Sequence, residues 1–95
     1  MRPEGKLEDY LGDEAEKNNI LYYKFLSGET GVPDRILVGN DLTVFVELKA
    51  ANGVLSERQK FVINAMRRHG AIVFIPYNKQ DIDEIINFMT KEKRL

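Results

Sequence analysis

Apolar residues recur at helical spacing in three stretches of the chain: 3–18, 56–70 and a last stretch that begins near Asp81. Each stretch has one apolar and one charged face, which is the pattern of an amphipathic helix packed against a core. Ser56 is a natural N-cap, because Gln59 three residues later can complete a capping box. The apolar positions that define the three faces are Leu7, Tyr10 and Leu11; Phe61, Val62, Ala65 and Met66; and Ile82, Ile85, Ile86 and Met89.

Four stretches between these helices have the composition of β-strands. Residues 20–26 are β-branched and aromatic enough to form a strand, and 34–38, which follow Pro33, are predicted as a short second strand. The sequence 39–41, Gly-Asn-Asp, is typical of a hairpin turn, so 42–49 is predicted to pair antiparallel with 34–38. Residues 71–75 are continuously apolar, which favours a strand covered on both faces, and we predict it at the centre of the sheet. The predicted order of elements is αβββαβα.

The composition limits the classes of protein and of site. The 95 residues predict one domain over 1–95, and the chain has neither a membrane-length apolar run nor a signal-peptide pattern. We therefore predict a cytoplasmic protein without a membrane partner. With no cysteine and one histidine, a thiolate zinc site, a disulfide framework and a cysteine nucleophile are excluded, and any metal must be a hard cation bound by oxygens. The net charge of −1 means that DNA affinity would need a local basic patch.

The strand predicted at 42–49 ends in two charged residues, where the interior of a sheet favours apolar ones. Glu47 and Lys49 share a face because alternate strand residues point to the same side. Desolvating an unpaired charge costs several kcal/mol or more, so both charges need partners or a function. Pairing with 34–38 brings Asp34 close to Glu47. The two faces of the strand are Leu42, Val44, Val46 and Leu48, and Thr43, Phe45, Glu47 and Lys49.

Short motifs on these elements resemble those of the VRR-NUC family, a compact branch of the PD-(D/E)XK nuclease superfamily. They are Tyr23-Lys24-Phe25, Gly31-Val32-Pro33-Asp34-Arg35, Phe45-Val46-Glu47-Leu48-Lys49 and Ser56-x-x-Gln59. The resemblance implies an α/β fold with a restriction-endonuclease-like αβββαβ core, in which helices flank a mixed sheet and a C-terminal helix follows. It also implies a Mg²⁺- or Mn²⁺-dependent phosphodiesterase that acts on DNA. Stand-alone members of the family resemble phage-encoded proteins, which implies a homodimer acting on branched DNA such as Holliday junctions, in the cytoplasm of the host.

The residues of the two central motifs suit this chemistry. Phosphodiester hydrolysis needs a deprotonated water and stabilisation of charge on the phosphate. The carboxylates of Asp34 and Glu47, with the carbonyl oxygen of Leu48, would offer a hard cation three oxygens and two negative charges. Lys49 lies on the strand face of Glu47 and is predicted to orient the attacking water or to stabilise the transition state.

The family pattern adds residues to this predicted site. It favours Glu4 as a further acidic group, with Glu8 one turn later as the alternative. Gln59 matches the extra polar residue that the family carries near the lysine. The candidate phosphate contacts are Lys24, Arg35 and Lys60.

Each assignment has a structural alternative. Glu47 and Lys49 can form an ordinary ion pair at a sheet edge. Gln59 can serve only the capping box, and Glu4 or Glu8 can be a solvated first-turn residue that complements the helix dipole. For the whole chain, the alternative is a DNA- or protein-binding module that keeps a nuclease fold without turnover. Such a module would bind DNA in a salt-sensitive way and would be indifferent to a chelator.

Overall fold

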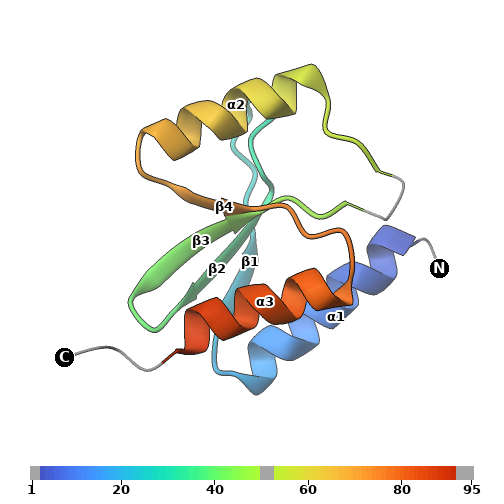
Figure 1. The fold of residues 1–95 in the computed structure, drawn as a ribbon, viewed down its shortest axis with the longest axis vertical. Coiled ribbons are helices and arrows are strands. Elements are labelled where there is room, and N and C mark those ends of the chain that lie inside the picture. Colours follow the sequence, from blue (N-terminus) through green and yellow to red (C-terminus); the bar gives the residue numbers. More distant parts are fainter. Residues whose placement is uncertain (1–2, 50–52, 92–95) are drawn as a thin grey trace.

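The computed structural model describes residues 3–49 and 53–91, with side chains described from residue 5 onward. Its elements follow the order αβββαβα, as predicted (Figure 1). Within these ranges no helix is both long and apolar enough to cross a membrane, and the longest helix has 15 residues. The helices are α1 (Pro3–Lys17), α2 (Glu57–Arg68) and α3 (Lys79–Thr90); the strands are β1 (Leu21–Lys24), β2 (Arg35–Gly39), β3 (Leu42–Val46) and β4 (Ile72–Phe74).

The strands form a four-stranded mixed sheet in the order β1-β2-β3-β4. β2 is antiparallel to both β1 and β3, whereas β3 and β4 are parallel, which confirms the predicted mixed sheet. The prediction that residues 71–75 form the central strand was wrong, because β4 lies at one end of this order, beside β3. A parallel neighbour requires a crossover connection, and α2 carries the chain from β3 across one face of the sheet to β4.

β4 is nevertheless apolar because both of its faces are covered. Val73 is buried and pairs with Phe45, on the face over which α2 lies. Ile72 and Phe74 pack against the main core on the other face, where Phe74 also meets Phe88 of α3 edge to face at a centroid distance of 5.4 Å. A continuous apolar run therefore reports the coverage of a strand and not its place in the sheet.

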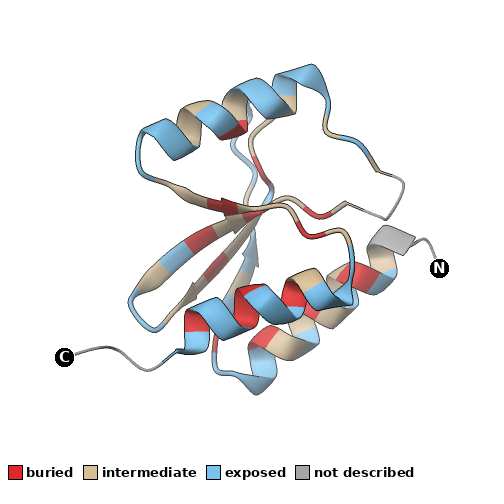
Figure 2. Cartoon of the chain, viewed as in Figure 1, coloured by how far each residue is buried: buried red, intermediate tan, exposed pale blue. Residues whose placement is uncertain are grey.

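The sheet lies between two helical layers, with α1 and α3 on one face and α2 on the other (Figure 1). Figure 2 shows buried positions spaced along α1 and α3, and these residues form one core with residues of the sheet. The predicted alternation in β3 is confirmed, because Val44, Val46 and Leu48 are buried in this core while Thr43 is exposed. The core consists of Leu7, Leu11, Ala15, Ile20, Leu37, Val44, Val46, Leu48, Ile82, Ile85, Ile86 and Met89.

A two-residue hairpin sets the register between β2 and β3. Asn40 and Asp41 have φ values of 51° and 65°, and two central residues with positive φ are the signature of a type I′ turn. The turn makes Gly39 the partner of Leu42, and the ladder runs from there to Arg35 opposite Val46. The predicted hairpin is confirmed, and its register determines which side chains meet where the two strands end.

Candidate active site

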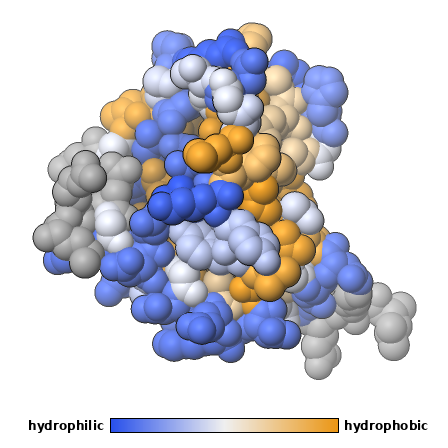
Figure 3. Space-filling model, turned by 180° about the vertical axis from the view of Figure 1, so that it is seen from behind, coloured by the Kyte–Doolittle hydropathy of each residue, from blue (hydrophilic) through white to orange (hydrophobic). Residues whose placement is uncertain are grey.

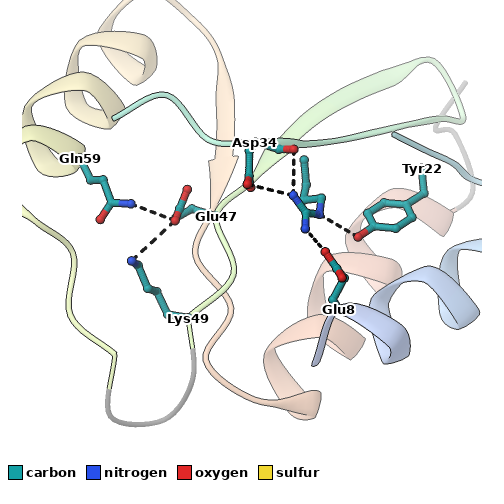
Figure 4. A network of polar contacts seen from close by, with 7 residues as sticks. Glu8, Tyr22, Asp34, Glu47, Lys49 and Gln59 are labelled. Carbon is teal, nitrogen blue, oxygen red and sulfur yellow. Dashed lines mark hydrogen bonds and ion pairs between the residues drawn. The ribbon is translucent and has the colours of Figure 1, made fainter. Parts of the chain in front are cut away.

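Asp34 comes directly before β2 and Glu47 directly after β3, so the two residues meet at one end of this strand pair. The register pairs Arg35 with Val46. Because the strands are antiparallel, the next pair beyond the ladder is Asp34 beside Glu47. The negative charge of Asp34 is close enough to raise the pKa of Glu47. Figure 4 shows both side chains in the same part of the sheet. The structure thus brings together the two carboxyl groups that the hairpin pattern predicted to meet.

The segment after β3 keeps the geometry of a strand. The N–H of Glu47 donates to the carbonyl of Phe74 at 3.0 Å, and the N–H of Lys49 donates to the carbonyl of Pro76 at 3.0 Å. The N–H groups of Glu47 and Lys49 are therefore directed to the β4 side. Backbone groups of successive strand residues alternate in direction, so the carbonyl of Leu48 is directed to the β2 side. The same alternation keeps the side chains of Glu47 and Lys49 on one face.

Gln59 joins the start of α2 to Glu47. Its Nε2 donates to Oε2 of Glu47 at 2.9 Å, and Nζ of Lys49 lies 3.6 Å from the same oxygen (Figure 4). The Oε1 atom of Gln59 accepts from the N–H of Ser56 at 2.9 Å, and its own N–H donates to Oγ of Ser56 at 3.0 Å. The predicted capping box is confirmed, and the same amide also contacts the candidate site.

Burial dominates the electrostatics of Glu47. The side chains of Glu47 and Lys49 are only 13% and 17% exposed. Desolvation raises the pKa of Glu47, and the charge of Asp34 raises it further, while Lys49 and the hydrogen bond from Gln59 act in the opposite direction. The carboxylate is therefore costly to ionise in the metal-free protein. A divalent cation between the two carboxylates would remove that cost, so the donor set fits a hard cation.

The structure separates the two candidates for the further acidic group. Glu8 of α1 forms an ion pair with Arg35, and the guanidinium of Arg35 also contacts Asp34. Arg35 therefore connects Glu8 to the candidate site. Glu4 belongs to α1, but its side chain lies outside the described residues. Across the described residues, no group of three or more acidic, histidine or cysteine side chains is arranged to hold a metal ion. The assignment of Glu4 stays a prediction.

The three predicted phosphate contacts have different surroundings. Lys24 is exposed at the end of β1, and Lys60 is exposed on α2, where its Nζ lies 3.0 Å from Oε2 of Glu57. The side chain of Arg35 is only 12% exposed and is held by Glu8 of α1, by Tyr22 of β1 and by Asp34, which directly precedes β2. This low exposure was not predicted, because an arginine beside Asp34 in the sequence is typical of a surface charge.

The loop before Asp34 is fastened to α2. Nε of Arg58 donates to the carbonyl of Thr30 at 3.1 Å. Gly31 has a φ of 95°, and a Cβ atom placed on it would lie 2.9 Å from the carbonyl oxygen of Arg58 and 3.0 Å from Cγ2 of Val62. Glycine is therefore required here both for the backbone conformation and for the close approach of α2.

We expect Gly31→Ala to cost more stability than Gly28→Ala. Both glycines have positive φ, but a Cβ on Gly28 would meet nothing within 4 Å, whereas one on Gly31 would meet backbone of α2. The difference between the two variants should be about 1–3 kcal/mol in the free energy of unfolding, measured by urea denaturation. Equal losses in the two variants would show that the loop does not pack on α2 as described.

Comparison with solved structures finds a similar fold in a chain described as a VRR_NUC domain. That chain superposes on this one with a TM-score of 0.83 and 26% sequence identity, over 92% of this chain and 97% of the other. No protein-family model and no curated protein sequence matches this chain. The two folds agree over nearly their whole lengths, which confirms the predicted α/β nuclease-type fold with its mixed sheet and flanking helices.

Proposed function

We propose that this chain, which belongs to the VRR-NUC family, is a divalent-metal-dependent endonuclease that hydrolyses phosphodiester bonds in structured or branched DNA. The observation that carries the proposal is the meeting of Asp34, Glu47 and Lys49 at one end of the β2–β3 pair. A largely buried carboxylate with a raised pKa, close to a second carboxylate and to an ammonium group, is a typical functional arrangement. A structural ion pair alone would not need Asp34.

The proposed cofactor is Mg²⁺ or Mn²⁺, held by the carboxylates of Asp34 and Glu47 and by the carbonyl oxygen of Leu48. These are hard oxygen donors of the kind that both ions prefer, with water and phosphate oxygens left to complete the shell. When bound, such an ion lowers the pKa of a coordinated water and neutralises charge that develops on the phosphate. Glu4 remains the proposed further acidic group.

The remaining residues position and stabilise the reacting groups. Lys49 presents its ammonium group on the face of Glu47, where it can hold the attacking water or donate to a phosphate oxygen in the transition state. Gln59 keeps Glu47 in place by a hydrogen bond from an amide that α2 holds through its capping box. The side chain of Glu47 is therefore fixed before the substrate binds, which is the geometry that electrostatic catalysis requires.

A homodimer is the proposed assembly, because two sites can then act on the two strands of a junction. β1 lies at one end of the strand order and carries Leu21 and Tyr23, which are 54% and 56% exposed. Figure 3, which views the molecule from behind, shows apolar side chains near the middle of the visible face, interrupted by hydrophilic ones. Apolar surface of this kind supports contact with a second copy. Lys24 and Lys60 are the proposed phosphate contacts on the surface.

A cleavage assay on defined substrates tests the proposal. Purified protein is incubated with end-labelled linear, flapped and four-way DNA, each with Mg²⁺, with Mn²⁺ or with EDTA. We expect scission with metal, none with EDTA, and a preference for branched substrates. Binding of DNA that is salt-sensitive and indifferent to EDTA, without any scission, would instead identify a binding module that keeps the nuclease fold.

A further inference from the structure

Arg35 is held at the centre of a polar network next to the candidate site. Its Nη1 lies 2.9 Å from Oδ2 of Asp34, its Nη2 pairs with Oε2 of Glu8, and its Nε donates to the hydroxyl of Tyr22 at 3.0 Å (Figure 4). Nη1 also donates to the backbone carbonyl of Asp34 at 3.2 Å. The partners come from α1, from β1 and from the residue directly before β2, and together they engage all three nitrogens of the guanidinium.

This arrangement fixes the carboxylate of Asp34. The side chain of Asp34 is 54% exposed, so without a partner it would sample several rotamers in water. Arg35 pairs with Oδ2 of the Asp34 carboxylate, so Oδ1 can bind a cation. Glu8 and Tyr22 fix the planar guanidinium of Arg35. The guanidinium in turn holds the carboxylate of Asp34 in one orientation.

We propose that Arg35 is a positioning residue, which with Tyr22 and Glu8 holds Asp34 in the orientation that binds the divalent cation. The inference rests on the proposed function and deepens it, since it assigns Arg35 to the metal site. A phosphate contact is the other role open to an arginine in this motif. Contact with DNA would require Arg35 to leave a site where it is only 12% exposed and to leave two carboxylates unpaired.

Two variants separate positioning from charge. Arg35→Lys keeps the positive charge but loses the planar fork. Tyr22→Phe removes only the hydroxyl that accepts from Nε; burial raises the pKa of Tyr22 to about 12, so this change removes no charge at neutral pH. Tyr23→Phe, on the exposed neighbour in β1, is the matched control. Mn²⁺ affinity is measured without DNA by isothermal titration calorimetry, with circular dichroism of each variant.

We expect Arg35→Lys to weaken Mn²⁺ binding by about 10-fold or more, as loss of a residue that orients a metal ligand does elsewhere. Tyr22→Phe should weaken it by a smaller factor and Tyr23→Phe should not change it. Excess Mn²⁺ should restore the cleavage rate of Arg35→Lys, because the defect lies in metal affinity. Unchanged Mn²⁺ affinity in Tyr22→Phe and in any folded Arg35→Lys protein would overturn the inference.

DNA binding in EDTA gives the second test. If Arg35 contacts a phosphate, Arg35→Met will reduce the slope of log affinity against log salt by about one unit. We expect that slope to stay as in the wild type, and a fall of one unit would overturn the positioning role. If the wild type itself does not bind Mn²⁺, the proposed metal-dependent function is contradicted. If the wild type binds Mn²⁺ and the Arg35 and Tyr22 variants bind it equally well, only the positioning role is contradicted.

Discussion

Replacement of Lys49 by Met is expected to reduce DNA cleavage by about 100- to 1000-fold while the protein stays folded and still binds Mn²⁺. That factor is typical for removal of one preorganised donor to a charge that develops in the transition state. The ammonium group of Lys49 lies 3.6 Å from Oε2 of Glu47, and its side chain is largely buried, so bulk water cannot replace its effect. Single-turnover cleavage of a four-way junction in saturating Mn²⁺ gives the measurement.

Lys60→Met is the matched control for this change. Lys60 is also a lysine close to a carboxylate, but both it and Glu57 are exposed on α2. Its loss should weaken DNA binding slightly and leave the rate of the bound complex unchanged. A Lys49→Met protein that cuts at the wild-type rate would place the chemistry elsewhere, and loss of Mn²⁺ binding in the same variant would show that Lys49 acts by supporting the metal site.

The convergence of Asp34 and Glu47 could be predicted because it depends on local signals. A tight turn at Asn40 and Asp41 sets the pairing of its two strands, and strand alternation then determines which side chains share a face. Both rules act over the few residues between the turn and the strand ends. The capping box of Ser56 and Gln59 was predictable for the same reason, since its two halves lie three residues apart.

The position of β4 and the network of Arg35 could not be predicted in the same way. Both depend on how separate elements pack. The apolar composition of β4 is the same whether the crossover through α2 returns it to the middle or to the end of the sheet. The side chain of Arg35 is only 12% exposed and pairs with Glu8 of α1, 27 positions away in the sequence (35 minus 8). No periodicity within one element contains that information.

The contact of Gln59 with Glu47 lies between these two cases. The capping box orients the amide of Gln59, and its remaining donor, Nε2, is left to point away from the helix end. Only the docking of α2 across the sheet brings Glu47 to that donor. The capping box and the hydrogen bond to Glu47 coexist, because they use different atoms of one side chain.

Mn²⁺ is expected to stabilise the wild-type protein against unfolding and to have little effect on an Asp34→Asn variant. A ligand that binds only the folded state adds about 2.7 kcal/mol at a concentration of 100 times its Kd. Asp34→Asn removes one of the two described carboxylates while keeping the shape of a side chain that is half exposed, so the metal-free fold should tolerate it. Thermal unfolding with and without Mn²⁺ provides the comparison.

The stabilisation by Mn²⁺ should also depend on pH in a direction set by Glu47. Burial and Asp34 raise the pKa of Glu47 above its ordinary value of 4.5, so the folded state holds this proton more tightly than the unfolded chain does. In the metal-free protein, the contribution of Glu47 to stability therefore falls as the pH rises from 4.5 through the raised pKa. Mn²⁺ binds the deprotonated carboxylate, so its stabilising effect should grow over the same interval.

Glu47→Gln separates this titration from the other acidic groups of the chain. The variant cannot ionise at this position, so its metal-free stability should lack the decline that wild type shows above pH 4.5. It should also lose stabilisation by Mn²⁺ at every pH, since an amide oxygen is a weaker ligand than a carboxylate and carries no charge. If Mn²⁺ raises the unfolding temperature of wild type equally across that pH interval, or stabilises Glu47→Gln as strongly, the carboxylate of Glu47 is not the ligand.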